Sequence, residues 1–388
     1  MQFEDTPLNQ ADRRYYTEAH EQFRDALGRF VREEIMPHVE AWEEAGKFPR
    51  ELYRKAASVG LLGIGFPEEY GGTPADVFYH LVALKELTRA GSGGLIASLL
   101  SHGIGAPPIL HFGSEALKRR VLPQILSGEK ISALAITEPS GGSDVAGLLT
   151  SARLDGGEYV VNGSKMFITS GMRADYYTVA VRTGGPGAAG VSLLLIERDR
   201  PGFTRTPLKK MGWWVSDTAA LYFDNVRVPA ANLIGEEGQG FKAIMSNFNM
   251  ERLTMAAIAC GFARVCLDDA LAWARERRTF GEPLIERQVI RHKLVDMQMR
   301  IEAGRALLED LAWRVQQGEH PVAQLAMLKN FATQTMQFCA DQAVQILGGA
   351  GYMRGTRPER IYREVKVMMI GGGSEEIMKD LAARQLGW

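Results

Sequence analysis

Two glycine-rich segments of the 388-residue chain carry most of the groups that suit recognition of a polar ligand. The first, AITEPSGGSDVAG (135–147), offers the hydroxyl groups of Thr137, Ser140 and Ser143 together with glycine N–H groups. Glycines let the backbone approach a ligand closely, and successive N–H groups bind anionic or carbonyl oxygens. The segment is therefore a candidate binding loop, although a plain turn also accounts for its composition.

The second segment, QILGGAG (345–351), ends an apolar helical stretch. A basic run follows it: Arg354, Arg357, Arg360, Arg363 and Lys366. Arginine suits phosphate because its planar guanidinium combines charge with paired hydrogen bonds. A helix C-cap followed by a solvated basic face explains the pattern without any ligand. A dinucleotide fingerprint is excluded, since Arg354 replaces the third glycine of G-x-G-x-x-G and a helical run precedes it.

Several other chemistries lack the residues they require. The seven histidines have no ligand spacing, and no C-x-x-C, H-E-x-x-H, G-x-S-x-G or Walker motif occurs, so we expect no metal site and neither a hydrolase nor an NTPase. Cys260, Cys266 and Cys339 lie in apolar helical stretches, which predicts free thiols in a reducing compartment. The formal net charge of −1 argues against binding to nucleic acid or to an anionic membrane.

The beginning of the chain, MQFEDTPLNQADRR, has no apolar core and is not Arg-rich and acid-poor. No stretch approaches the ~20 apolar residues that span a bilayer. We therefore expect a mature cytoplasmic protein without a membrane segment.

The segments that must position these loops form a helical region, then a β-rich region, then a second helical region, which predicts an α+β fold. The three domains are expected at residues 1–130, 131–239 and 240–388. Asp155-Gly156-Gly157 predicts a hairpin turn, because glycine tolerates positive φ. Apolar residues recur at three- and four-residue steps after position 288, which predicts a packed bundle helix. They are Ile290, Leu294, Met297, Ile301, Leu308, Leu311 and Val315.

In these segments the sequence resembles the acyl-CoA dehydrogenase family. The resemblance extends from FPRELYRKAASVGLLGIGFPEEYGG to the C-terminus. The first family signature is matched by Ala135, Ile136, Thr137, Glu138, Gly141, Gly142, Ser143, Asp144 and Gly147. The second is matched by Gln345, Gly348, Gly349, Gly351, Tyr352, Arg360 and Glu364, and departs at Gly355, where the family has Asp, Glu or Asn. The resemblance implies an N-terminal α-helical domain, a middle β-barrel-like domain and a C-terminal four-helix bundle, assembled as a homotetramer.

The resemblance also implies FAD as cofactor and an acyl-CoA thioester as substrate. Phe167, Ile168 and Thr169 match the strand that lies against the isoalloxazine, with the threonine hydroxyl near N5. The expected pyrophosphate and adenosine contacts come from a neighbouring subunit, through Arg277, Thr279, Phe280, Gln288, Gln345, Gly348 and Gly349. The other expected cofactor residues are Ile136, Thr137, Ser143, Ser374 and Glu376, and the expected substrate residues are Ser143, Asn249, Arg252 and Gly372.

Desaturation at the α,β carbons requires a carboxylate base and donors for the thioester oxygen. Many family members carry the glutamate in a turn that here reads Gly371-Gly372-Gly373-Ser374, with Gly372 in its place. Isovaleryl and long-chain enzymes carry it instead on a bundle helix, in a Glu-Arg pair that Glu251 and Arg252 match. The resemblance therefore implies that Glu251 is the base, with the N–H of Gly372 and a flavin ribityl hydroxyl as donors to the thioester.

Alternatives remain open for the base and for the function. Glu251 can instead be a solvent-facing acid in a helix's first turn, where the helix dipole favours it. Glu375 and Glu376 are rival bases, although Ser374 suits an N-cap with both in its first turn. An oxidase or flavin monooxygenase of the same fold, or a silent acyl-CoA-binding scaffold, competes with a dehydrogenase that passes electrons to an electron-transfer flavoprotein. The glycine run and the helix-borne base favour a long or branched acyl chain, and Trp213-Trp214 either shortens the pocket or packs the β domain.

Overall fold

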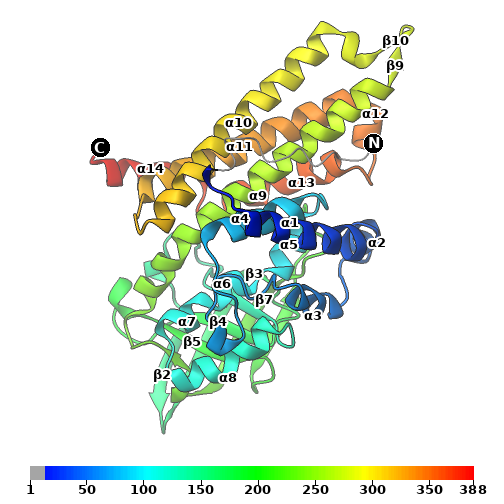
Figure 1. The fold of residues 1–388 in the computed structure, drawn as a ribbon. Coiled ribbons are helices and arrows are strands. Elements are labelled where there is room, and N and C mark those ends of the chain that lie inside the picture. The colour runs from blue at the N-terminus through cyan, green and yellow to red at the C-terminus, as the bar shows by residue number, and fades with distance from the viewer. Residues whose placement is uncertain (1–13) are drawn as a thin grey trace. The chain divides into compact units, whose positions relative to one another are not determined.

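The computed structural model describes residues 14–388, and Figure 1 shows how their helices and strands succeed one another. Residues 1–13, which include most of the chain start discussed above, lie outside the described residues. The chain forms two compact units. Unit 1 consists of Met1–Glu40, Ala75–Gly93 and Met250–Trp388, and unit 2 of Ala41–Pro74 and Gly94–Asn249.

Unit 1 is helical, with one short β-hairpin. Its elements are α1 (Glu18–Phe30), the π-helical η2 (Val31–Ile35), α4 (Val77–Thr88), most of α9 (Gly240–Glu276), β9 (Arg278–Thr279), β10 (Glu282–Pro283), η7 (Leu284–Glu286), α10 (Gln288–Gln316), α11 (Val322–Leu347), α12 (Gly349–Tyr352), α13 (Arg357–Ile370) and α14 (Glu375–Leu386). The long helices α9, α10 and α11 run lengthwise beside one another, and α13 packs on α11 (Figure 1). The predicted helical bundle is therefore present.

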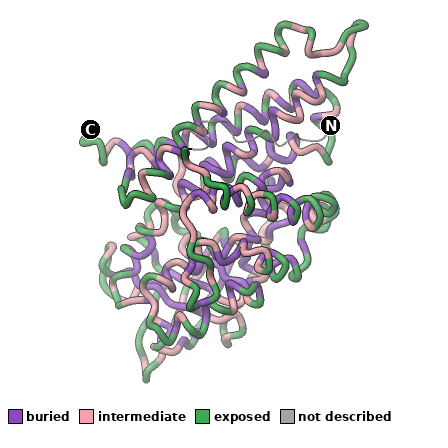
Figure 2. The backbone as a smooth tube through the Cα atoms, in the orientation of Figure 1, coloured by how far each residue is buried: buried purple, intermediate pink, exposed green. Residues whose placement is uncertain are grey.

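The apolar stripe of α10 faces the inside of this bundle. Leu294, Met297, Ile301, Leu308 and Leu311 are buried, and the tube view shows the same alternation of buried and exposed positions along the helix (Figure 2). A stripe at three- and four-residue steps lies on one helix face, so its burial removes one continuous apolar surface from water. The prediction of a core-packing stripe is confirmed for these five residues, whereas Ile290 and Val315, near the two ends of the helix, are half-buried.

Two residues of the second signature attach α13 to the segment after α4. Glu364 is fully buried and accepts a hydrogen bond of 2.7 Å from the N–H of Gly93. Arg360 donates to the carbonyl of Gly91 at 3.2 Å and forms an ion pair with Glu40. A buried charge is tolerated only when such partners replace water. Arg360 and Glu364 therefore stabilise the helical unit.

The first helical stretch is interrupted. The helix α1 ends at Phe30, η2 follows, and a new helix, α2 (Val39–Ala45), begins after Pro37. The N–H of Met36 bonds to the carbonyl of Val31 at 2.9 Å, which is the wider π-helical spacing. Proline supplies no N–H to continue the ladder, so the helix is interrupted there.

Unit 2 contains the sheet and a layer of helices. The helices are α3 (Glu51–Ser58), η3 (Glu68–Tyr70), α5 (Gly93–Leu99), α6 (His102–Gly105), α7 (Pro107–Phe112), α8 (Glu115–Leu126), η4 (Val145–Gly147), η5 (Ala188–Gly190) and η6 (Ala230–Asn232). The strands are β1 (Ser132–Ala135), β2 (Ser151–Asp155), β3 (Glu158–Thr169), β4 (Tyr176–Arg182), β5 (Val191–Glu197), β6 (Phe203–Pro207), β7 (Thr218–Pro229) and β8 (Leu233–Ile234). Their order is β6-β7-β3-β2-β4-β5-β8, with β1 parallel to β4.

The sheet of unit 2 confirms the middle β region and its predicted hairpin. Asp155 pairs with Glu158 across β2 and β3, and Gly156 and Gly157 between them have φ of +60° and +85°. Both values lie in the left-handed region that a two-residue hairpin turn requires. A core packs α7 and α8 against β4 and β5, around Ile109, Val121 and Leu193.

Among residues 14–388 no single helix is long and apolar enough to cross a bilayer. Two helical segments joined by a bend, Gly93–Leu99 and His102–Phe112, together meet the criteria for a membrane span, but by length and composition alone.

Candidate functional site

In unit 2 the first signature loop, residues 135–147, lies beside strand β3. The N–H of Met166 donates to the carbonyl of Thr137 at 2.8 Å, and Lys165 Nζ donates to the carbonyl of Ile136 at 2.9 Å. A Cβ at Gly142 would come within 3.2 Å of the Thr137 methyl group, so glycine permits this close fold. The structure thus brings together Ile136, Thr137 and the end of β3, as the prediction requires.

A buried ion pair fixes this loop. Lys165 Nζ lies 2.8 Å from Glu138 Oε1, and the two residues are 0% and 5% exposed. Glu138 also accepts from the N–H groups of Leu149 and Thr150 at 2.6 and 2.9 Å. Burial lowers the pKa of Lys165 to about 8 against the opposing effect of Glu138. Burial also raises the pKa of Glu138, but hydrogen bonds from Lys165 and Thr150 outweigh it and leave that pKa below its usual value.

The end of β3 has an unusual backbone. Phe167 and Ser170 have φ of +62° and +59°, which non-glycine residues rarely adopt. Phe167 is 68% exposed, whereas Ile168 is buried and Thr169 is half-buried. Strained residues persist only where surrounding contacts hold them, and they cluster at functional sites. An exposed aromatic ring and, two residues on, a hydroxyl residue therefore lie on a fixed strand end, where the family resemblance implies a flavin contact.

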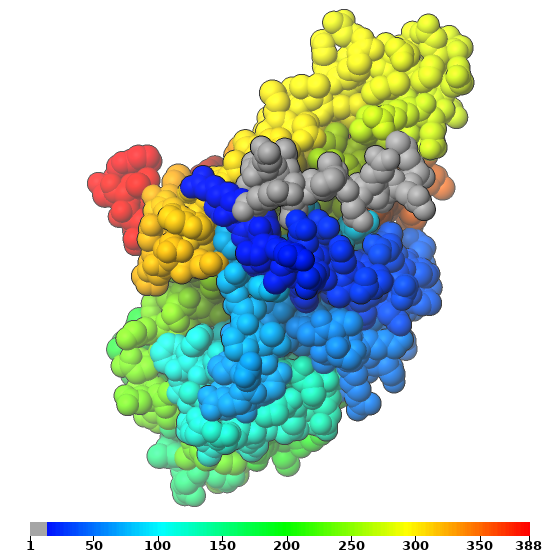
Figure 3. Space-filling model, viewed as in Figure 1, coloured from blue at the N-terminus to red at the C-terminus, as the bar shows by residue number. Residues whose placement is uncertain are grey.

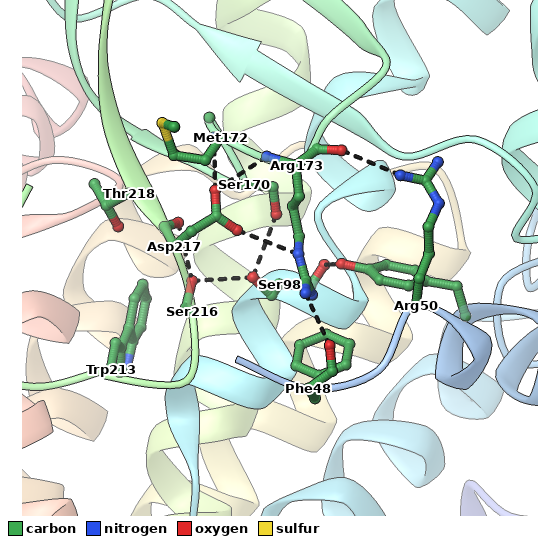
Figure 4. A network of polar contacts seen from close by, with 12 residues as sticks. Phe48, Arg50, Ser98, Ser170, Met172, Arg173, Trp213, Ser216, Asp217 and Thr218 are labelled. Carbon is green, nitrogen blue, oxygen red and sulfur yellow. Dashed lines mark hydrogen bonds and ion pairs between the residues drawn. The ribbon is translucent and has the colours of Figure 1, made fainter. Parts of the chain in front are cut away.

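Asp217 holds the turn that follows this strand end (Figure 4). Its main-chain carbonyl accepts from the N–H of Ser170 at 2.9 Å, and its Oδ2 accepts from the N–H groups of Met172 and Arg173 at 2.6 and 3.3 Å. Arg173 Nε lies 3.4 Å from Asp217 Oδ1, and Arg173 Nη2 donates to the carbonyl of Phe48 at 2.9 Å. Several hydrogen bonds thus fix the residues directly after Thr169.

Three buried serines complete the same network (Figure 4). Ser98 Oγ lies 3.0 Å from Ser216 Oγ and 3.3 Å from Ser170 Oγ, and all three residues are at most 1% exposed. Because hydroxyls both donate and accept, such a cluster satisfies itself without water. It joins α5, the turn after β3 and the loop before β7 within unit 2.

Trp213 and Trp214 belong to that loop before β7. Trp213 has φ of +55°, and a Cβ at Gly94 would lie only 2.8 Å from its Cα. Trp214 Nε1 donates to the carbonyl of Lys210 at 3.2 Å. These contacts support the interpretation that the two tryptophans pack within unit 2, which contains the β-sheet.

In unit 1 Glu251 lies well inside α9. The helix begins at Gly240, so the alternative that places Glu251 in a first turn is wrong. The residue is half-buried, and its Oε2 is shielded from solvent and has no hydrogen-bond partner among the described residues. Burial raises the pKa of Glu251 to about 7, although Arg252 and Lys329 act in the opposite direction. A carboxyl group with this pKa suits proton transfer at neutral pH.

Glu251 lies near the glycine turn, which we define as residues 371–373. Gly372 has φ of +65°, and a Cβ there would lie 2.6 Å from Met255 Sδ and 3.9 Å from Glu251 Oε1. A glutamate at 372 would therefore meet both backbone strain and the Met255 side chain. The carboxyl group of Glu251 instead lies close to the position where such a side chain would begin.

The rival carboxylates lie on α14 and have other partners. Ser374 caps this helix, as expected, by accepting from the N–H of Ile377, and Glu375 and Glu376 lie in the first turn. Hydrogen bonds from Lys379 and Gln334 hold the pKa of Glu375 below its usual value. The exposed Glu376 has a lowered pKa because its own backbone N–H and Ser374 bond to its carboxylate. Lowered pKa values make weak bases, so these pKa directions make Glu375 and Glu376 weaker candidates than Glu251.

The remaining predicted cofactor residues lie at the surface of unit 1. Phe280, in the hairpin between α9 and α10, is 97% exposed with φ of +53°, and this yellow end of the unit is visible in Figure 3. Arg277, Gln288, Gln345, Gly348 and Gly349 are also exposed, and Thr279 is half-buried. Gly348 caps α11, which confirms the helix end predicted there. Their cofactor role stays a prediction.

Sequence reasoning missed three charged residues that support these segments: the buried Lys165 and Lys329 and the half-buried Asp217. Each makes several hydrogen bonds in the structure. Charged residues are usually exposed, so their types alone give no indication of burial. Among residues 14–388 no group of three or more His, Cys, Asp or Glu side chains is placed to hold a metal ion.

Comparison with known proteins gives the class and the family of this chain. The models of the acyl-CoA dehydrogenase N-terminal, middle and C-terminal domains match residues 17–129, 133–226 and 238–387. An acyl-CoA dehydrogenase of Bacillus subtilis is 39% identical over 375 residues, covering 96% of this chain and 99% of the relative. The chain therefore belongs to the acyl-CoA dehydrogenase family and is an oxidoreductase of that kind.

Solved structures agree with this assignment. The structure of a probable acyl-CoA dehydrogenase from Mycobacterium abscessus has a TM-score of 0.95 and 47% identity, and the match covers 96% of this chain and all 100% of that one. A glutaryl-CoA dehydrogenase from Mycobacterium smegmatis in complex with FADH2 has a TM-score of 0.91 and 29% identity, over 98% and 97% of the two chains. The family is flavin-dependent.

Removal of the Lys165 ammonium is expected to destabilise unit 2. In Lys165→Met, Glu138 stays buried without its charged partner, which costs about 3–5 kcal/mol and lowers the thermal midpoint by about 10 °C. The double variant Glu138→Gln/Lys165→Met should recover much of this loss. Arg119→Met, which breaks an exposed pair with Glu115, is the control and should change the midpoint by about 1 °C or less. Equal effects at both pairs would contradict the role assigned to Lys165.

Glu251→Gln is expected to stabilise the protein at high pH. Because burial raises the folded-state pKa of Glu251 from 4.5 to about 7, the unfolded chain ionises first, so the penalty on the fold grows between pH 4.5 and 7 and levels off above pH 7. The variant should match wild type near pH 4.5 and exceed it by about 3 kcal/mol at pH 8. Thermal unfolding between pH 5 and 8 measures this difference. Glu276→Gln, at the exposed end of α9, should show no such trend.

Proposed function

We propose that the protein is an FAD-dependent acyl-CoA dehydrogenase that forms an α,β double bond in an acyl-CoA thioester, with Glu251 as the base. The observation that carries this proposal is the shielded Glu251 carboxyl group beside the glycine turn, with a pKa raised by burial to about 7. The family membership supplies the reaction type, and the geometry supports the choice of base.

The strand end and the signature loop fit a flavin. Phe167 offers an exposed aromatic surface, Thr169 offers a hydroxyl, and the loop offers Ser143 with neighbouring glycines. A rigid aromatic face suits a planar ring, and hydroxyl and N–H donors suit its polar edge. When bound, FAD supplies the two-electron acceptor for the hydride that leaves the β-carbon.

The residues of unit 1 carry the proton chemistry. Glu251, ionised at neutral pH in a large fraction of molecules, takes the α-proton and becomes the neutral acid. Its burial matters because a base whose pKa lies near the working pH combines availability with driving force. The N–H of Gly372 can donate to the thioester oxygen as negative charge grows there, and a fixed donor in a shielded place stabilises that charge strongly.

We further propose a long or branched acyl chain, an electron-transfer flavoprotein as acceptor, and a cytoplasmic homotetramer of three-domain subunits with boundaries near 130 and 239. The glycine turn and the helix-borne base motivate the substrate class. The exposed Arg277 and Phe280 motivate contacts between subunits, and the three cysteines are free and buried, as suits a reducing compartment. Asn249 and Arg252 are assigned to the substrate on the family pattern.

Glu251→Gln tests the base directly. The variant should retain bound flavin but lose its bleaching by acyl-CoA under anaerobic conditions, with a fall in rate of at least about 10³-fold, because no carboxylate takes the α-proton. Stopped-flow absorbance at the flavin band measures the rate, with Glu276→Gln as control. Bleaching by Glu251→Gln at near wild-type rate would contradict the assignment.

The rate of flavin reduction in the wild-type protein should increase with pH, because the reaction requires the unprotonated form of the base. It should rise about tenfold per unit below pH 7 and level off above it, since the ionised fraction of Glu251 follows its pKa of about 7. Single-turnover reduction across pH 5.5–9 provides the profile. A rate that falls as pH rises through this range excludes a carboxylate base with this pKa.

Anaerobic titration with a panel of acyl-CoA thioesters of different length and branching identifies the substrate. Long or branched thioesters should bleach the flavin faster than butyryl-CoA. Hydrogen peroxide release in air, compared with reduction of an artificial acceptor, distinguishes a dehydrogenase from an oxidase. A flavin spectrum that no thioester changes would indicate a silent binding protein.

A further inference from the structure

Lys329, on α11, has no part in either family signature and is completely buried, with 0% of its surface exposed. Its Nζ donates hydrogen bonds to the carbonyl oxygens of Met369 at 2.9 Å and Gly373 at 2.7 Å. An ammonium group remains inside a protein only where fixed dipoles or charges replace its water. These two carbonyl oxygens therefore replace water around the ammonium group of Lys329.

The two carbonyls lie on either side of Gly372. Met369 belongs to the last turn of α13, and Gly373 ends the glycine turn. Gly372 and Gly373 have φ of +65° and +107° and carry no side chain that could anchor them. The ammonium of Lys329 thus joins the residues before and after the peptide N–H of Gly372 and restricts its movement.

The same ammonium bears on the charge of Glu251. Burial raises the pKa of Glu251, and the positive charges of Arg252 and then Lys329 oppose that effect. Glu251 Oε1 is 3.9 Å from the place of a Cβ at Gly372, so the base and the turn share one neighbourhood. One lysine therefore affects both the donor and the base of the proposed reaction.

Other charged groups contribute to this neighbourhood from neighbouring helices. Arg252 and Glu251 on α9, and Glu375 and Glu376 on α14, act on the pKa of Lys329, which burial lowers to about 8. His80 on α4 bonds to Thr254 of α9, and burial lowers its pKa to about 4, so it is neutral at pH 7. The positive charges that favour an ionised Glu251 are those of Arg252 and Lys329.

We propose that Lys329 is a positioning residue for the reaction, because it fixes the glycine turn that presents the N–H of Gly372 and supports the ionised form of Glu251. This rests on the proposed function. Lys329 acts through these two groups.

Lys329→Met tests the proposal because methionine has a similar length but neither charge nor donors. Its anaerobic flavin reduction should show a pH midpoint displaced upward by about one unit. The rate at the optimum should fall about 10- to 100-fold, since the donor is no longer held in place. The KM for acyl-CoA should change less than threefold. Lys329→Gln, which keeps one donor but no charge, should show the same pH displacement with a smaller loss of rate.

Asn330→Ala is the matched control. Asn330 follows Lys329 on α11 and donates to the carbonyl of Glu375 at 2.9 Å, but carries no charge. It should lower the thermal midpoint without displacing the pH profile. A Lys329→Met or Lys329→Gln protein with bound flavin, an unchanged pH midpoint and an unchanged rate would overturn the proposal while leaving the dehydrogenase function intact.

A second measurement does not depend on activity. The change in thermal midpoint caused by Glu251→Gln between pH 5 and 8 is compared in wild type and in Lys329→Met. The stabilisation by Glu251→Gln should begin near pH 4.5 in both backgrounds, because the unfolded-state pKa sets its onset, but in Lys329→Met it should level off at a pH about one unit higher and be larger at pH 8. An unchanged pH dependence rejects the electrostatic role of Lys329 even if no thioester bleaches the flavin, an outcome that would separately reject the proposed function.

Discussion

Burial of a carboxyl group destabilises its ionised form, since protein atoms replace water around a charge, and the glycine turn of unit 1 is arranged around such a group. Glu251 is half-buried, and its shielded Oε2 has no hydrogen-bond partner among the described residues. The nearby turn has a backbone that only glycine adopts readily, and Met255 fills the space where a side chain at 372 would begin. The absence of a side chain at 372 and the presence of Glu251 are thus parts of one packing arrangement.

The strained end of β3 in unit 2 is fixed in a different way. Positive φ at Phe167 and Ser170 costs conformational energy, and hydrogen bonds to Asp217, together with the Ser98 cluster, offset it. The Glu138–Lys165 pair likewise fixes the loop that lies beside β3. In unit 2 the segments that carry the candidate site residues are therefore held by buried and half-buried polar side chains, which restrict movement more effectively than exposed loops do.

Part of this arrangement was predictable because it depends on local properties of the chain. The stripe from Leu294 to Leu311 predicted a buried helix face, Gly156-Gly157 predicted a hairpin turn, and Gly348 and Ser374 predicted helix caps. Each involves residues a few positions apart, where the helical or strand period and the allowed φ values govern the outcome. The family signatures added the β3 strand end and the signature loop.

The sequence by itself determined the order of elements, the family and the candidate base, since these follow from periodicity and from motifs along the chain. Only the tertiary structure decided that Glu251 lies within α9 rather than in a first turn, and that its carboxyl group is shielded near Gly372. Only the structure revealed Lys329 against Met369 and Gly373, 40 and 44 positions away in the chain. The physical reason is that pKa and burial depend on which distant segments pack around a group, and no spacing within one segment encodes that packing.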